Sequence, residues 1–262
     1  MNFQRTSIDS FCALALAATA VSAVALEPVS GFEYLKPETQ ALQLDDFENP
    51  GLATVERGAE LFNAAPTNDA KACADCHGDS GASLDTKAIA RYPTYRPERG
   101  DGATAIVTLQ QQIELCRENS GAPALPADHP DLIALETFVR NLALGETVAV
   151  QTTGAVEPLL RQGEGLYNKR WGLIDMSCYH CHTLYAGRKV RGQLISQGQA
   201  NGFPVYRLAS GEMASLQQRI QQCLTLMRAE PFATGSEENT LLELYIMSRS
   251  NGLAIETPAV RY

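Results

Sequence analysis

The chain has 262 residues, of which 45% are hydrophobic and 19% are charged, and its formal net charge is −9. This length suffices for one large domain or two small ones, and the composition excludes a collagen, a low-complexity disordered chain and a polytopic membrane protein. The acidic balance argues against general nucleic-acid binding, which needs a net basic face, but it permits a local basic pocket for a small anion.

Residues 1–25 have the three parts of a secretory signal peptide. A weakly basic start contains Arg5, an apolar run follows over 11–18, and the segment ends at Ala25 in an A-x-A sequence. The apolar run is short for a membrane span, which needs about 20 apolar residues. We therefore expect cleavage after Ala25 and export of the mature chain, most simply to a bacterial periplasm.

The pattern C-x-x-C-H occurs twice, in Cys73, Cys76 and His77 and again in Cys178, Cys181 and His182. This spacing is the attachment signature of c-type haem. Two thiols three positions apart can bond both vinyl groups of one porphyrin, and the adjoining His can bind the iron. A redox dithiol would need a βαβ context, which is missing, and a zinc site would need four ligands close in sequence. We predict two covalently bound haem c groups.

The two halves of the chain repeat each other. Residues 55–62 match 160–167 at the offset of 105 that separates the two motifs, and 109–116 match 216–223 at an offset of 107. Each half is predicted to contain a short amphipathic helix, the haem motif, a long loop, a helix with one Cys and a closing helix. The fold is therefore expected to be mainly α, with two tandem cytochrome c-like domains that arise from internal duplication.

The predicted domains cover residues 26–150 and 151–262, and the first and last helices of each are expected to cross beside the haem. Gly58 and Gly163 lie in the middle of first helices, where Gly costs about 1 kcal/mol relative to Ala, so a close helix–helix contact is expected at each. Residues 145–154 lack a helical period and are predicted to form a linker.

Other segments have no obvious role in the repeat. Residues 26–50 have no counterpart in the second half. The loops 78–105 and 183–210 are long and rich in Gly, Pro and Arg, and loops of this length usually carry function or pack against a cofactor.

The second axial ligand of each haem has several candidates. The first half contains no Met between Met1 and Met176, which leaves Cys116 and His129. The second half offers four side chains, namely Cys223, Met213, Met227 and Met247. His180 lies inside its motif and is badly placed to reach around the ring.

The duplication favours Cys116 and Cys223, because both occupy the same place on one apolar helix face. They would pair with His77 and His182, and an anionic sulfur would lower the reduction potential of each haem relative to Met. Two alternatives remain open. The cysteines can form a Cys116–Cys223 disulfide in an oxidising compartment, or they can be buried, inert thiols.

The two cysteine helices differ in charge. Gln112 aligns with Arg219 and Glu114 aligns with Gln221, so the second copy has gained a cation and lost an anion. Arg219 and Cys223 are four residues apart and therefore neighbours on one helical face. An Arg beside a haem-bound sulfur is suited to hold a small oxyanion such as sulfate, sulfite or thiosulfate.

Four more basic residues in the second half can add to the field at this site or can simply be solvated: Arg188, Lys189, Arg191 and Arg228. The first three directly follow the haem motif.

The sequence resembles the SoxA family, the dihaem subunits of the SoxAX cytochromes of bacterial thiosulfate oxidation. The resemblance covers essentially the whole mature chain and is most specific over residues 219–223, which are followed by Met227-Arg228 and Pro231-Phe232. It implies His/Cys ligation of both haems, with Cys223 as the catalytic cysteine and Arg219 as the substrate-binding arginine.

The resemblance also implies a reaction and partners. Thiosulfate would be coupled oxidatively to a cysteine of the carrier SoxYZ, the activity of an L-cysteine S-thiosulfotransferase. Two electrons would leave through haem c to SoxX, a smaller one-haem cytochrome, and to a soluble cytochrome c. The rival interpretations are a dihaem electron carrier without a sulfur substrate, a dihaem peroxidase and a non-enzymatic sulfur-binding module.

Overall fold

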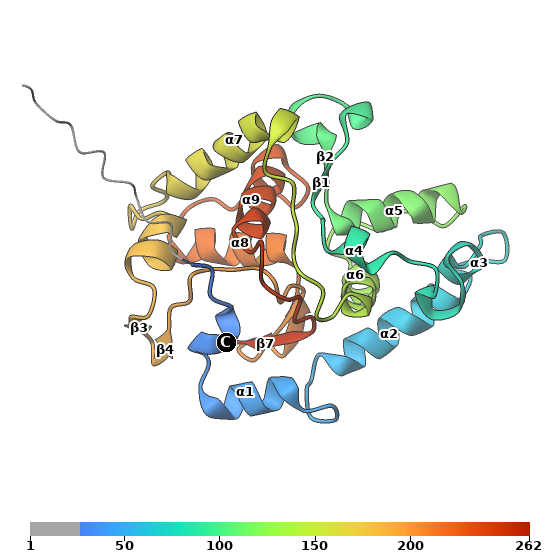
Figure 1. Ribbon diagram of the computed structural model, residues 1–262, viewed down its shortest axis with the longest axis horizontal. Helices are drawn as coiled ribbons and strands as arrows, with labels where there is room; N and C mark the ends of the chain where they lie inside the picture. Colours follow the sequence, from blue (N-terminus) through green and yellow to red (C-terminus); the bar gives the residue numbers. More distant parts are fainter. Residues whose placement is uncertain (1–26) are drawn as a thin grey trace, which may run out of the picture.

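A computed structural model describes residues 27–262, so the predicted signal peptide lies outside the described residues. The chain forms two helical halves that lie side by side, coloured cyan to green and yellow to red in Figure 1. Within the described part of the chain, no helix combines the length and the apolar character that crossing a bilayer requires.

The helices follow the predicted repeat. The first half contains α1 (Pro37–Leu44), α2 (Leu52–Asn63), α3 (Cys73–His77), α4 (Thr86–Ile89), α5 (Leu109–Asn119) and α6 (Pro130–Leu142). The second half contains α7 (Glu157–Asn168), a π-helical turn at His180–Leu184, α8 (Leu216–Leu226) and α9 (Glu237–Ser248). Thus α7, α8 and α9 repeat α2, α5 and α6.

The strands are short and lie in the loops. An antiparallel pair in the first half joins β1 (Thr94–Tyr95) to β2 (Ile106–Val107). The second half has the hairpin β3 (Lys189–Val190) and β4 (Gln193–Leu194) and a three-stranded sheet of β5 (Val205–Arg207), β6 (Glu212–Ala214) and β7 (Ala259–Arg261). Strand β5 pairs antiparallel with β6 and parallel with β7. The pairs β1–β2 and β5–β6 each lead directly into a cysteine helix.

The two cysteine helices begin in the same way. Thr108 caps α5 and Ser215 caps α8, and each hydroxyl accepts a hydrogen bond from the backbone N–H three residues later. The side chain of that third residue, Gln111 or Gln218, accepts a hydrogen bond from the backbone N–H of the cap in return. This reciprocal cap satisfies two N–H groups that a helix start leaves free, which fixes where each cysteine helix begins.

The expected close helix contacts at Gly58 and Gly163 are confirmed. A Cβ atom at Gly58 would lie 2.1 Å from the carbonyl oxygen of Ala134 in α6. At Gly163 it would lie 2.3 Å from the carbonyl oxygen of Leu241 in α9. Because Ala134 and Leu241 occupy equivalent places, both halves use a glycine to bring the first and closing helices into backbone contact.

The segment predicted as a linker is packed between the halves. Val148 and Val150 are buried, at 1% and 3% exposure. The backbone N–H of Val148 donates to Leu253 O at 2.9 Å, and that of Ala149 donates to Ala90 O at 3.0 Å. The two halves therefore share one continuous hydrophobic core.

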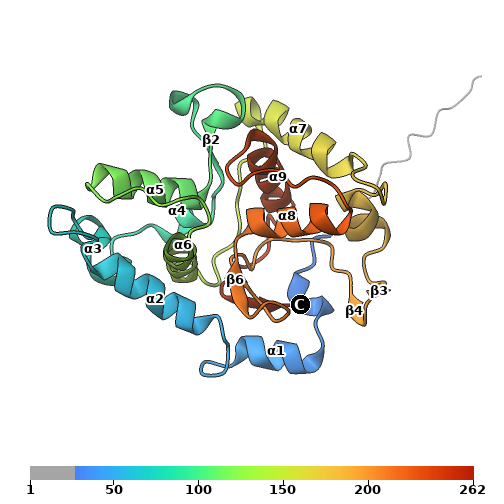
Figure 2. The ribbon, with the colours of Figure 1, turned by 180° about the vertical axis from the view of Figure 1, so that it is seen from behind.

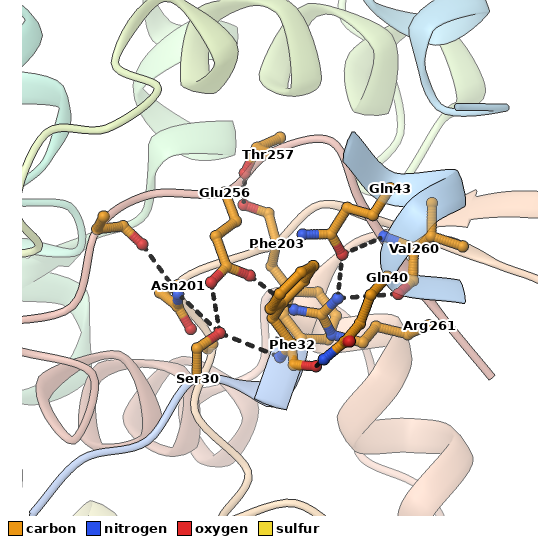
Figure 3. A network of polar contacts seen from close by, with 12 residues as sticks. Ser30, Phe32, Gln40, Gln43, Asn201, Phe203, Glu256, Thr257, Val260 and Arg261 are labelled. Atoms are coloured by element: carbon orange, nitrogen blue, oxygen red, sulfur yellow. Dashed lines mark hydrogen bonds and ion pairs between the residues drawn. The ribbon is translucent and has the colours of Figure 1, made fainter. Parts of the chain in front are cut away.

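Residues 27–49, which have no counterpart in the repeat, pack against the second half. Both ribbon views place α1 beside β7 and the C-terminus (Figures 1 and 2). The side chain of Gln43 accepts hydrogen bonds from the backbone N–H of Val260, at 3.0 Å, and from Arg261, while Ser30 bonds Glu256 (Figure 3). This segment thus ties the end of the chain, and with it β5, to the rest of the fold.

Candidate active site and haem-binding clusters

The first cysteine cluster joins α3 to α5. Burial raises the pKa of the Cys73 thiol, and the nearby sulfurs of Cys116 and Cys76 raise it further, against the opposing charge of Arg117. The ring of His77 packs 6.3 Å from that of Phe62, between centroids. The structure therefore brings Cys116 to the first haem motif, as the duplication predicts.

The second cluster joins the other haem motif to α8. Burial raises the pKa of Cys178 to about 12, and the Cys223 sulfur adds to this effect. Burial likewise raises the pKa of Cys181, again with a contribution from Cys223. Cys223 is thus close to both cysteines of the motif.

Cys223 itself is surrounded by positive groups. Burial raises the pKa of its thiol, but Arg219, a hydrogen bond and charge from His182, and the charge of Arg207 outweigh burial and lower it to about 7. The sulfur therefore reaches its anionic form, the form that binds metal and attacks sulfur, more readily than an ordinary thiol does. This is the chemistry that the predicted roles of Cys223 and Arg219 need.

The orientation of the His182 ring is fixed by the loop 196–198. The Nδ1 of this ring lies 2.9 Å from the carbonyl oxygen of Ser196, which assigns a proton to Nδ1 and leaves Nε2 as the ring nitrogen that would bind an iron. A Cβ atom at Gly198 would lie 2.8 Å from the same ring, so the loop 196–198 fits closely around it. A backbone carbonyl behind a ligating His is the usual way to fix its tautomer and orientation.

These donor sets fit a covalently attached haem. Each cluster offers two motif thiols, an adjoining imidazole and one further thiol from a helix on another part of the chain. The six described cysteines are all free, and Cys116 and Cys223 lie in different clusters, so the Cys116–Cys223 disulfide is absent. Residues 27–262 contain no group of three His, Cys, Asp or Glu side chains placed to hold a bare metal ion.

The other ligand candidates have local roles. His129 caps α6 by accepting a hydrogen bond from the Asp131 N–H at 3.2 Å. His180 bonds the hydroxyl of Ser177 through Nδ1, at 2.6 Å. Met227 and Met247 are core residues, at 8% and 5% exposure.

In the first half, Cys116 has a neutral hydrogen-bond donor beside it, and the nearby Arg117 is paired with an acidic side chain. The side-chain amide of Gln112 donates to Cys116 Sγ at 3.2 Å. Arg117 forms an ion pair with Glu114, at 3.1 Å, and also donates to Pro123 O at 2.9 Å. Glu114 accepts a further hydrogen bond from the backbone N–H of Leu125.

In the second half, the equivalent position carries Arg219, which no acidic side chain in residues 27–262 neutralises. Its side chain donates to Gln222 on its own helix, at 3.2 Å. Gln221, at the position of Glu114, instead donates to Phe232 O and to the hydroxyl of Thr234. The charge difference predicted from the sequence is therefore present in the structure: the cation beside Cys116 has an acidic partner, whereas Arg219 has none in residues 27–262.

The four basic residues that the sequence suggested could add to the field are exposed and form no ion pair within the described chain: Arg188, Lys189, Arg191 and Arg228. Their position agrees with the solvated-loop interpretation.

Arg207 is a member of this site that the sequence analysis missed. It ends β5, and burial together with Arg219 lowers its pKa to about 10 while the Cys223 sulfur opposes that shift. The missed signal is a further repeat, Y-P-T-Y-R at 92–96 and F-P-V-Y-R at 203–207. Its offset of 111 differs from those of the flanking helices.

Comparisons with known proteins agree along both halves. Residues 57–148 and 162–255 match the family model of the SoxA/TsdA cytochrome c domain. The chain is 37% identical to the L-cysteine S-thiosulfotransferase subunit SoxA of Rhodovulum sulfidophilum, across 88% of this chain and 79% of that protein. It is 36% identical to the corresponding subunit of Pseudaminobacter salicylatoxidans, across 90% and 81%. The crystal structure of SoxXA from P. pantotrophus matches with a TM-score of 0.79 and 31% identity, covering 90% of this chain and 87% of that chain.

Proposed function

The chain belongs to the SoxA/TsdA cytochrome c family, and from this premise we propose that it is the SoxA subunit of a SoxAX-type L-cysteine S-thiosulfotransferase. In this role it couples thiosulfate oxidatively to a cysteine of the SoxYZ carrier protein. One observation carries the assignment of the site: Cys223 lies beside both the second haem motif and the unpaired Arg219.

Two haem c groups complete the protein in this proposal. Cys73 and Cys76 would hold the first, and His77 and Cys116 would bind its iron. The second has its own set of four: Cys178, Cys181, His182 and Cys223. When bound, the haems accept the electrons of the reaction one at a time and pass them on.

The side chains of the second half bind and couple the substrate. Arg219 holds the sulfonate end of thiosulfate through charge-assisted hydrogen bonds, which directs the terminal sulfur toward Cys223. A sulfur–sulfur bond forms between that terminal sulfur and the Cys223 thiolate, and two electrons leave. The carrier thiolate then attacks the terminal sulfur and takes it with its sulfonate, which restores the Cys223 thiolate. The net change is carrier thiol plus thiosulfate giving carrier S-thiosulfonate, one proton and two electrons.

We assign SoxX, a monohaem cytochrome, as the partner subunit and a soluble cytochrome c as the electron acceptor, in the periplasm. The SoxXA name of the matching crystal structure supports the first of these. Exposed apolar side chains flank the second haem motif in the sequence and lie at the end of α8, and we propose that they contribute to the contact with SoxX: Leu173, Ile174, Tyr179, Leu184, Tyr185, Val190, Leu194 and Leu226.

The decisive experiment mixes the haem-loaded complex with thiosulfate, reduced carrier and ferric cytochrome c. The proposal expects cytochrome c reduction that requires both sulfur substrates and a carrier mass increased by one S-thiosulfonate group. Electron transfer from an artificial donor without any thiosulfate-dependent reduction would instead support the electron-carrier function. The intact mass of the loaded chain, measured in parallel, counts the haems.

A further inference from the structure

The pentapeptide repeat places an arginine in the same structural position of each half. Arg96 follows β1 and Arg207 ends β5, and both strands lead through a hairpin partner into a cysteine helix. Arg207 is near the Cys223 sulfur, and Tyr92, which holds Arg96, is near Cys116. The two arginines therefore hold equivalent places in the two halves.

In the first half, neighbouring hydroxyl groups hold the arginine. The guanidinium of Arg96 donates to the Tyr92 hydroxyl at 3.0 Å and to the Thr94 hydroxyl at 3.4 Å. Both partners belong to the pentapeptide itself. The guanidinium of Arg96 is therefore hydrogen-bonded within its own segment.

In the second half, both of these hydroxyl groups are gone. Phe203 stands in place of Tyr92 and Val205 in place of Thr94, so neither side chain can accept a hydrogen bond. Within residues 27–262, the Arg207 side chain forms neither a hydrogen bond to another residue nor an ion pair, although it is partly buried.

The charge around Arg207 is not balanced by neighbouring groups. Its charged neighbours are Arg219 and Cys223 from α8, Arg261 from β7 and Glu212, which lies opposite it in β6 but forms no ion pair with it. Arg261 is paired with Glu256 at 2.8 Å, which leaves Arg207 and Arg219 as two unpaired cations beside one sulfur. A single thiolate balances at most one of these two cations, so a bound anion removes the unfavourable charge that remains.

We propose that Arg207 is a second substrate-binding residue and that Arg207 and Arg219 together clamp a dianion, thiosulfate, beside the Cys223 sulfur. This inference rests on the proposed function, because it names a further residue of the same site. Two cations match the two charges of free thiosulfate. Once the terminal sulfur is bonded to Cys223 and two electrons have left, the bound group carries one negative charge, so the clamp favours the reactant over its products.

The test measures anion selectivity in the haem-loaded complex, with Arg207→Gln as the main variant. Sulfate and nitrate serve as a dianionic and a monoanionic competitor of thiosulfate, and calorimetry measures sulfate binding to the resting protein without turnover. Loss of one charge-assisted hydrogen-bonding group should weaken sulfate binding about 10- to 100-fold. Nitrate inhibition, which needs one cation, should change about threefold or less.

Two further variants keep the result interpretable. Phe203→Tyr restores the hydroxyl that holds the first-half arginine, so it should weaken sulfate binding while leaving the Arg207 charge in place. Arg96→Gln makes the same change in the first half and should leave sulfate binding unchanged. Unaltered haem absorbance in each variant verifies the fold.

Unchanged sulfate binding in Arg207→Gln, or an equal loss in Arg96→Gln, overturns the clamp. Failure of the proposed function looks different, because the wild-type complex would then show no thiosulfate-dependent reduction of cytochrome c. Sulfate calorimetry reports on the clamp in either case.

Discussion

Helices α5 and α8 are copies that begin with the same cap and carry a cysteine at the same position, yet the two sulfurs meet different surroundings. Cys116 accepts a hydrogen bond from neutral Gln112, and the nearby Arg117 is paired with Glu114. Cys223 faces Arg219 and Arg207, neither of which has an acidic partner in residues 27–262.

This contrast indicates a division of labour on one scaffold. In the first cluster, the polar groups around the cysteine are satisfied by neighbouring protein groups, so this cluster is suited to hold a haem at a fixed potential. The second cluster carries unpaired positive charge beside a sulfur whose pKa is lowered, and it is suited to bind an anion. The two clusters therefore differ through a few substitutions on and beside helices that keep the same place in both halves.

The largest effect is expected from Cys223→Met. A thioether can still ligate iron but cannot form the sulfur–sulfur bond to thiosulfate. Thiosulfate turnover should fall by at least about 10³-fold, in the range that loss of a nucleophile produces. Stopped-flow reduction of cytochrome c checks this, and the matched variant Cys116→Met should keep most of the turnover. Equal losses of thiosulfate turnover in the two variants would contradict the proposal that only the second half carries the sulfur chemistry.

The next effect is expected from Arg219→Gln, which gives the second half the residue found at position 112. Loss of a charge-assisted hydrogen bond, about 1.5–3 kcal/mol, should lower kcat/KM for thiosulfate roughly tenfold to a hundredfold. Reduction of the haems by a small artificial donor should be unaffected. The control is Gln112→Arg, which should add no thiosulfate chemistry to the first half. A normal rate at subsaturating thiosulfate would remove Arg219 from the site.

A smaller effect on turnover, but a clear one on potential, is expected from Cys116→Met. A neutral thioether stabilises ferric iron less than a thiolate does, so the potential of the first haem should rise. We expect a rise on the order of 100 mV, within the roughly 0.8 V range set by axial ligands. Spectroelectrochemical titration of both haems measures it. If neither midpoint moves, Cys116 is not a ligand.

Much of the fold was predictable because the duplication preserves spacing. The haem motifs, the cysteine helices and the two helix-crossing glycines all keep an offset of 105 or 107, and the structure confirms their arrangement. The SoxA resemblance is confirmed by the family model and by the curated relatives. Haem ligation and the catalytic roles of Cys223 and Arg219 stay predictions.

The missed features depend on long-range contacts or on loops of unequal length. Arg207 escaped notice because its repeat has an offset of 111, set by different loop lengths on each side. The packing of residues 27–49 on β7 joins the two ends of the chain, and local patterns carry no information about such pairing. Strands of two or three residues are likewise too short to give an alternation signal.

The halves meet at a pair of equivalent carboxyl groups, Glu136 and Glu243. Gln110 donates to Glu136 at 3.1 Å, and the equivalent Gln217 donates to Glu243 at 2.7 Å. Burial raises the pKa of Glu136 from its ordinary 4.5 to about 8, with help from Glu243 and Asp128 and against the opposing Arg140. Burial likewise raises the pKa of Glu243 to about 7.

These shifts predict how the free energy of unfolding depends on pH. The last variant, Glu136→Gln, isolates the contribution of Glu136, and it should leave turnover unchanged. Between pH 4.5 and about 8 the folded state keeps a proton on Glu136 that the unfolded state has lost. This contribution to stability therefore falls as pH rises through the window, by at most about 1.4 kcal/mol per pH unit, and levels off above it. A neutral amide can still accept the hydrogen bond from Gln110, so the variant should lose less stability than the wild type between pH 5.5 and 8.5. Urea unfolding of the haem-loaded protein at both pH values measures the difference, with the exposed Glu56→Gln as control. If wild type and variant lose the same stability between these pH values, Glu136 is already ionised in the folded protein at pH 5.5.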